Sequence, residues 1–121
     1  MLFKQDTRVV PYELYLVGKQ LAISFMTRAE LLLWQRTAGW GPQRTAGLDR
    51  FLTDYVVLPC DSELWEAWAE VKHACQPKGR EMSHSDAWIA ATALIYALPL
   101  VTHNRRHFEA VDGLRVISGA Q

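Results

Sequence analysis

The stretch SHSDAWIAATALIYALPLVTHNRRHF, which spans residues 83–108, determines the predicted fold. Ser83 and Asp86 form the S-x-x-D pattern of a capping box, so we predict a helix that begins at His84. No Gly or Pro interrupts the chain from Ala87 to Ala97, and apolar residues recur all round this segment. Such a pattern is typical of a helix that is buried on most of its surface.

A short strand and a polar turn follow this helix. Leu98 and Pro99 end the helix, and residues 100–102 (LVT) form a short apolar run that fits the interior of a parallel sheet. Residues 103–106 (HNRR) leave the carboxyl end of that strand. Functional sites of open α/β sheets lie where strands end and helices begin, so we expect the chemistry of the chain at this turn.

Short apolar strands alternate with helical segments through the rest of the chain. This alternation indicates βαβ units and a parallel sheet, which makes the fold class α/β. Capping residues or Pro open the helices, and Gly or Pro residues close them. We predict strands at residues 21–24, 56–58 and 114–117, and helices at residues 10–17, 27–38, 42–54 and 62–75.

The composition describes an ordinary globular chain. Its 121 residues fit a single domain over residues 1–121. Lys plus Arg (13) equals Asp plus Glu (13), which excludes a strongly basic nucleic-acid binder, so any RNA contact must come from a local patch. We find no secretory signal and no apolar run near the ~20 residues that span a bilayer. A cytoplasmic protein is therefore expected, with Cys60 and Cys75 as reduced core thiols.

Three polar residues are candidates for a metal site. Glu30, Asp86 and Asn104 each follow a strand or open a helix, so they can converge at one edge of a parallel sheet. Carboxylate and amide oxygens are the ligands that Mg²⁺ or Mn²⁺ prefers. The alternative is structural: Glu30 and Asp86 occupy the fourth position of capping boxes opened by Thr27 and Ser83, and Asn104 suits a turn.

Two further groups of residues suggest contacts with other molecules. Arg105 and Arg106, with His103 and His107 beside them, form a basic cluster that could hold RNA phosphates, although exposed arginines are more often only solvated. Among the five Trp residues, Trp40 and Trp65 fit the core pattern least well. If both are exposed together they mark a partner surface, and otherwise they belong to the core.

The motifs DAWIAATA and LPLVTHNRRHF together resemble those of the PIN-domain nucleases, especially the VapC-type toxins of toxin–antitoxin pairs. The segment ISFMTRAEL, residues 23–31, resembles the family's strand-S-x-x-[ST]-x-x-E-L pattern. The resemblance implies a three-layer sandwich and an Mg²⁺-dependent endoribonuclease. It assigns Glu30, Asp86 and Asn104 as the catalytic metal ligands, and it implies RNA as substrate, a cognate antitoxin as partner and a homodimer.

The beginning of the chain departs from the family pattern. PIN domains open with a central strand that ends in a metal-binding Asp, typically L-L-D-T-N, and a short helix follows it. This chain opens MLFKQDTR, which resembles the segment just after that helix, so the resemblance implies a domain that is truncated at its N-terminus relative to the family. Asp6 does not stand at a strand end. We therefore predict a gap, or a foreign strand, between the strands ending near Ser24 and Thr102. The alternative function is an inactive PIN remnant that only binds another protein.

Overall fold

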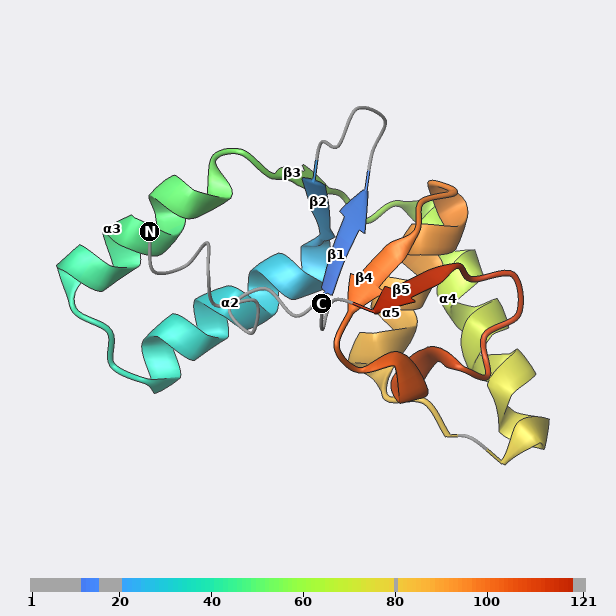
Figure 1. Cartoon of the computed structure of the whole chain (residues 1–121). Helices are drawn as coiled ribbons and strands as arrows, with labels where there is room; N and C mark the ends of the chain where they lie inside the picture. The colour runs from blue at the N-terminus through green and yellow to red at the C-terminus, as the bar shows by residue number, and fades with distance from the viewer. Residues whose placement is uncertain (1–11, 16–20, 80, 119–121) are drawn as a thin grey trace.

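The computed structural model describes residues 12–15, 21–79 and 81–118. Within these residues the chain alternates strands and helices, as Figure 1 shows. The strands are β1 (Tyr12–Tyr15), β2 (Leu21–Ser24), β3 (Val56–Leu58), β4 (Leu100–Thr102) and β5 (Val116–Ser118). The α-helices are α2 (Phe25–Thr37), α3 (Pro42–Leu52), α4 (Ser62–Cys75) and α5 (His84–Ile95), and the short 3₁₀ helices are η2 (Gln76–Lys78) and η3 (Arg105–Phe108).

The strands form one sheet in the order β3-β2-β1-β4-β5. The pairs β2–β3 and β4–β5 are parallel, as the alternation of strands and helices predicts. β1 lies between these pairs and runs antiparallel to both of its neighbours. The sheet is therefore mixed rather than wholly parallel.

The predictions for the region around β1 are wrong in two respects. A strand covers Tyr12–Tyr15, where we predicted a helix over residues 10–17; the remaining residues of that helix lie outside the described part of the chain. β1 also fills the place where we predicted a gap or a foreign strand. The physical reason is that β2 and β4 each present backbone groups that need partners, and aromatic residues such as Tyr12 and Tyr15 suit a strand.

Three side-chain caps define where the helices begin. Ser83 Oγ accepts from the Asp86 backbone N–H at 3.0 Å, so the predicted start of α5 at His84 is confirmed. The Asp61 carboxylate caps α4 in the same way. The cap of α2 differs from the prediction: Ser24 Oγ, and not Thr27, receives the backbone N–H of Thr27 at 3.1 Å. The helix begins at Phe25, so Glu30 lies beyond its first turn and has no capping role.

The main hydrophobic core lies between the sheet and the helices α4 and α5. α5 contributes the small, fully buried residues Ala87, Ala90 and Ala91, and η3 contributes Phe108, which is 1% exposed. Small side chains let α5 approach the sheet closely, which fits the uninterrupted apolar sequence from which we predicted its burial. Phe108 anchors η3 on the core and thereby fixes the turn that carries the predicted site residues.

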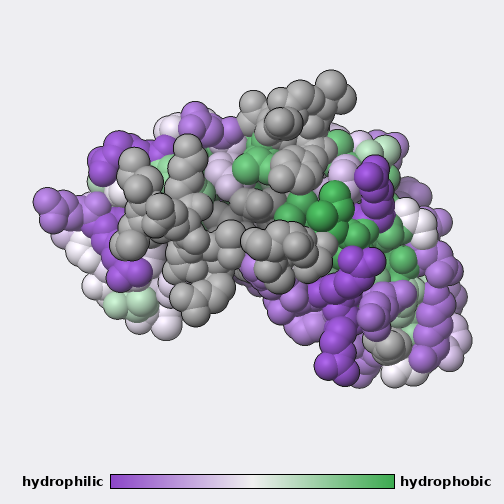
Figure 2. Space-filling model, in the orientation of Figure 1, coloured by the Kyte–Doolittle hydropathy of each residue, from purple (hydrophilic) through white to green (hydrophobic). Residues whose placement is uncertain are grey.

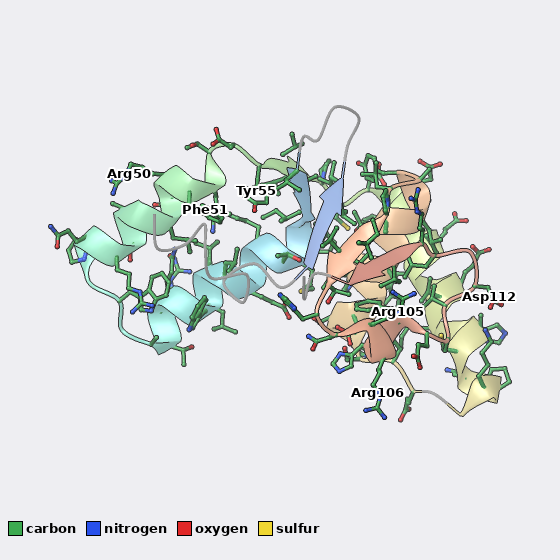
Figure 3. All side chains as sticks on the ribbon, in the orientation of Figure 1. Arg50, Phe51, Tyr55, Arg105, Arg106 and Asp112 are labelled. Carbon is green, nitrogen blue, oxygen red and sulfur yellow. The ribbon has the colours of Figure 1, made fainter. Side chains whose placement is uncertain are left out.

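A second, smaller cluster holds α2 and α3 together. It consists of Ile23, Leu31, Leu48 and Leu52, with Trp40, Phe51 and Tyr55 packed against it. In Figure 1 these two helices form a unit that extends away from the β3 side of the sheet. Figure 3 shows the Phe51 and Tyr55 side chains within this unit.

The tryptophans and cysteines divide between core and surface. Trp68 stacks on Trp88 with ring centroids 5.0 Å apart, whereas Trp40 is half-buried against Trp34 on the α2–α3 unit. Trp65, on α4, is 59% exposed. Trp40 and Trp65 therefore lie on different helical units and do not form one exposed surface. Cys75 is buried as predicted, but Cys60 is exposed, so the prediction of two core thiols is wrong for Cys60.

On the face shown in Figure 2, hydrophilic residues gather over η3, and apolar residues lie over β4 and β5. In the described part of the chain, no helix combines the length and the apolar character needed to cross a membrane.

Candidate metal centre

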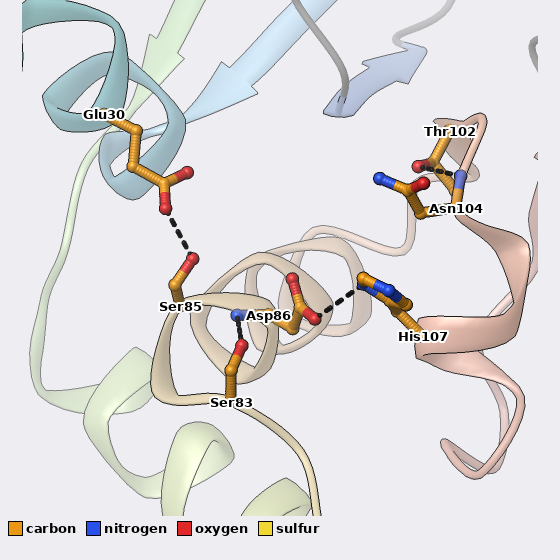
Figure 4. Close-up of polar contacts among 7 residues, drawn as sticks. All are labelled: Glu30, Ser83, Ser85, Asp86, Thr102, Asn104 and His107. Atoms are coloured by element: carbon orange, nitrogen blue, oxygen red, sulfur yellow. Dashed lines mark hydrogen bonds and ion pairs between the residues drawn. The ribbon is translucent and has the colours of Figure 1, made fainter. Parts of the chain in front are cut away.

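The three predicted site residues come from three different elements. Glu30 lies on α2, Asp86 in the first turn of α5, and Asn104 directly after β4. Figure 4 shows their side chains arranged around the amino end of α5. Two contacts join neighbouring elements here: Ser85 on α5 bonds Glu30 on α2, and His107 on η3 pairs with Asp86 on α5. Neither contact joins two of the three predicted residues directly, so their convergence on one cation stays a prediction.

Glu30 is held by a neighbour of Asp86. The Ser85 hydroxyl donates a hydrogen bond to Glu30 Oε2 at an oxygen–oxygen distance of 2.6 Å. The Glu30 side chain is exposed, and Ser85 is half-buried. Since Ser24 caps α2, the structural explanation for Glu30 as a capping residue does not apply.

Asp86 is the most enclosed of the three side chains, with 13% of it exposed. Its Oδ2 lies 3.1 Å from Nδ1 of His107. The backbone of Asp86 takes part in the cap of α5, but its carboxylate faces η3. The Asp86 carboxylate therefore lies at the amino end of α5, where the helix dipole points its positive end.

Asn104 stands where β4 gives way to η3. Its backbone N–H donates to Thr102 Oγ1 at 3.0 Å, and its side chain is exposed. This hydrogen bond to the buried Thr102 fixes the backbone at Asn104. It agrees with the alternative interpretation of the sequence, in which Asn104 is a turn residue. In Figure 4 the Asn104 amide lies on the His107 side of Asp86, opposite Glu30.

The donor set fits a hard divalent cation. Two carboxylates and one amide provide only oxygen ligands, which is the chemistry that Mg²⁺ and Mn²⁺ select. Within residues 12–15, 21–79 and 81–118, no three His, Cys, Asp or Glu side chains gather into a set that could hold a metal. The predicted set therefore has two carboxylates, Glu30 and Asp86, and depends on the Asn104 amide for a third protein ligand.

The two predicted RNA-binding arginines differ in their surroundings. Arg105 Nη1 donates to the Val116 carbonyl at 3.2 Å and so ties η3 to β5. Arg106 lines a pocket of about 320 Å³ that also touches Asp86 and His107. Figure 3 shows Arg106 extending away from the sheet, whereas Arg105 lies beside β5. Of the pair, Arg106 is the one that shares a pocket with Asp86.

Two contacts of the site were not predicted. From the sequence, His107 belongs to the predicted basic cluster, and neither its pairing with Asp86 nor a role for Ser85 is predicted. Ser85 directly precedes Asp86, and His107 lies three residues after Asn104. Polar residues so close to candidate ligands are the signal that could have identified both of them as partners of the site.

The fold and this site define a known class of protein. A family model described as PIN domain matches residues 3–114. The chain belongs to the PIN-domain family.

Within that family, the chain is similar to the VapC proteins. It is 34% identical to Ribonuclease VapC5 of Mycobacterium tuberculosis over 101 residues, which cover 81% of this chain and 73% of the relative. Among solved structures, DNA-bound VapBC from Salmonella typhimurium matches with a TM-score of 0.74 and 28% identity, over 80% of this chain and 74% of that one. VapBC-5 of Mycobacterium tuberculosis matches with a TM-score of 0.62 and 32% identity, over 78% and 77%. The resemblance indicated by residues 83–108 is confirmed.

Proposed function

We propose that this protein is a VapC-type toxin, a metal-dependent endoribonuclease that hydrolyses RNA phosphodiester bonds. The observation that carries the proposal is the arrangement of Glu30, Asp86 and Asn104 on three elements around the amino end of α5, with Ser85 bonded to Glu30 and His107 paired with Asp86. The similarity to Ribonuclease VapC5 supports the reaction class.

The chain's own residues would bind the cation and the RNA phosphates. Glu30, Asp86 and Asn104 hold the cation through oxygen ligands, and the helix amino end adds positive potential beside the phosphate. When bound, Mg²⁺ or Mn²⁺ supplies charge neutralisation and makes a water molecule more acidic. Arg106, and with it Arg105, contacts phosphate groups of the RNA, because guanidinium groups match phosphate oxygens.

The family also implies one domain over residues 1–121 with helices on both sides of the sheet, and we propose that architecture here. The main core beneath α4 and α5 and the separate α2–α3 unit support it.

β1 lies centrally in the sheet, and Tyr12 pairs with Thr102. The amino end of β1, rather than its carboxyl end, therefore lies at the edge that carries the site.

We further propose that the chain binds a cognate antitoxin and forms a homodimer. The matched VapBC-5 structure is described as a member of a family of toxin–antitoxin systems. Leu33 and Trp65 are 63% and 59% exposed, and they supply apolar surface for such contacts. Light scattering of the purified chain, with and without the antitoxin, tests both parts.

Cleavage of RNA by the purified full-length chain tests the enzymatic proposal. We expect cleavage that requires Mg²⁺ or Mn²⁺, stops on addition of a chelator, and falls by about 10²–10³-fold in Asp86→Asn and Glu30→Gln, each of which removes one negative charge. Glu63→Gln, which neutralises an exposed carboxylate on α4, is the matched control and should retain full activity. Equal cleavage by Asp86→Asn and the unmodified chain would exclude Asp86 from the site.

A protein-binding module without catalytic activity is the second candidate function. The exposed Leu33 and Trp34 on α2 favour it, because they place apolar surface outside the core of the monomer. If the unmodified chain binds the antitoxin but does not cleave RNA in the presence of Mg²⁺ or Mn²⁺, this function replaces the first.

A further inference from the structure

The hydrogen bond between Ser85 and Glu30 connects two helices that are far apart in the chain. Ser85 lies on α5 and Glu30 on α2, and the oxygen–oxygen distance is 2.6 Å. Bonds to ionised acceptors are short, and this distance falls within the range for a hydroxyl that donates to a carboxylate. The contact is therefore a strong, specific one between the two halves of the site.

Ser85 is not needed to begin its helix. The hydroxyl that caps α5 belongs to Ser83, which accepts the Asp86 N–H. The packing of α2 against α5 has its own contact in the edge-to-face pair of Phe25 and Trp88, with centroids 5.3 Å apart. Neither the start of α5 nor its packing on α2 requires the Ser85 hydroxyl, so the role of the hydroxyl lies with Glu30.

Without a partner, the Glu30 carboxylate would be poorly placed. An exposed Glu side chain loses considerable rotamer freedom when it is fixed, so a free Glu30 would sample many positions. Ser85 directly precedes Asp86, so the same turn of α5 that presents one carboxylate fixes the other. A carboxylate has about four acceptor positions, so the bond to Oε2 leaves capacity for a cation.

We propose that Ser85 is a positioning residue, whose hydroxyl holds the Glu30 carboxylate beside Asp86 so that both bind one divalent cation. The inference rests on the proposed metal-dependent function and assigns a role to a residue that supplies no ligand itself. Partners of this kind, which orient metal ligands, typically change metal affinity by about 10–100-fold when they are removed.

Calorimetric titration of the full chain with Mn²⁺ tests the proposal without depending on RNA cleavage. We expect Ser85→Ala to bind Mn²⁺ about 10–100-fold more weakly than the unmodified chain, and Ser85→Thr, which keeps a hydroxyl, to recover much of the affinity. Ser62→Ala is the matched control, because it makes the same change in the first turn of α4 and should leave the affinity unchanged.

A double variant identifies the group through which Ser85 acts. If Ser85 works through Glu30, then Ser85→Ala combined with Glu30→Gln should bind Mn²⁺ no more weakly than Glu30→Gln alone. Additive losses would overturn the proposal, because they would mean that the two residues act independently.

The remaining outcomes separate this inference from the proposed function. If the unmodified chain binds Mn²⁺ and Ser85→Ala binds it equally well, the positioning role fails and the proposed function stands. If the unmodified chain does not bind Mn²⁺, both fail. Thermal unfolding without metal provides the last check. If the melting temperature falls more in both Ser85→Ala and Ser85→Cys than in Ser62→Ala, the hydrogen bond serves fold stability and the positioning role is overturned.

Discussion

The α4–α5 half of the molecule and the α2–α3 unit differ in how completely they bury their side chains. α5 places Ala87, Ala90 and Ala91 at 0% exposure beneath the sheet. On α2, by contrast, Leu33 is 63% exposed, and Nη1 of Arg28 and Nε2 of Gln35 are buried without a hydrogen-bond partner among the described residues. Both units expose some apolar surface, since Trp65 on α4 is 59% exposed, but among the described residues the buried, unsatisfied side-chain polar atoms belong to α2.

The candidate site lies across this division. Asp86 comes from the well-packed half and Glu30 from the α2–α3 unit, and the Ser85 hydroxyl joins them. The geometry of the site therefore depends on how the α2–α3 unit is held against α5. Stability measurements on variants of the two units test this dependence.

Cavity-forming substitutions should produce the largest difference in stability between the two halves. Ile89→Ala in α5 should lower the free energy of unfolding by about 4 kcal/mol, and Leu52→Ala in α3 by about 2 kcal/mol. Ile89 is 1% exposed within the main core, whereas Leu52 is 7% exposed in the smaller cluster, which can close around a lost side chain more easily. Urea denaturation measures both. A cost for Leu52→Ala equal to that of Ile89→Ala would remove the distinction between the halves.

Loss of a helix cap, in contrast, should cost more stability in the α2–α3 unit than in the α4–α5 half. Ser24 is buried, accepts from the Thr27 N–H and also donates to Thr27 Oγ1 at 3.2 Å, whereas the exposed Ser83 serves mainly as a cap. Ser24→Ala should cost about 2 kcal/mol of unfolding free energy and Ser83→Ala about 1 kcal/mol. Thermal unfolding of the two variants gives the order, and the reverse order would show that the buried hydroxyl of Ser24 adds nothing beyond a cap.

Removing an unsatisfied donor should stabilise the α2–α3 unit. Gln35→Met keeps the approximate shape of a side chain that is 8% exposed and removes an Nε2 that has no hydrogen-bond partner within residues 12–15, 21–79 and 81–118, so the free energy of unfolding should rise by about 1 kcal/mol. The exposed Gln43 on α3 provides the control, and Gln43→Met should change stability by less than about 0.5 kcal/mol. Loss of stability in Gln35→Met would mean that Gln35 makes a favourable contact in solution.

The exposed tryptophans should show the smallest effects. Trp65→Ala should change the free energy of unfolding by less than about 0.5 kcal/mol, because the side chain is mostly in solvent. Trp34 packs edge-on against Trp40 with centroids 4.9 Å apart, so Trp34→Ala should cost about 1 kcal/mol. Fluorescence-monitored denaturation compares the two variants, and a marked loss of stability in Trp65→Ala would place Trp65 in a contact that the monomer does not show.

Local signals account for what the sequence predicts well. The cap at Ser83, the small apolar residues of α5 and the strand at Leu100–Thr102 all depend on residues close in sequence, and all three are confirmed. Two overlapping patterns, Ser24-x-x-Thr27 and Thr27-x-x-Glu30, compete for the start of α2, and only burial of the Ser24 hydroxyl decides between them.

Contacts between distant residues account for what the sequence does not predict. The pairing of His107 with Asp86 depends on how η3 packs on α5, and that packing is fixed by Phe108 in the core. The direction of β1 depends on its neighbours rather than on its own four residues, whose Tyr-rich sequence fits more than one structure. Neither feature can be inferred from spacing within one segment.

The central position of β1 has a consequence for the order of folding. The parallel pairs β2–β3 and β4–β5 each join segments separated by one crossover, whereas β1 pairs Tyr12 with Thr102, near opposite ends of the chain. Closing so long a loop costs considerable chain entropy before the contacts between β1 and β4 can offset it. Since β1 pairs with the neighbouring β2 at short range, pairing of β1 with β4 should be the late and slow step, and a chain arrested before it would carry two small sheets, each with an open edge available for aggregation.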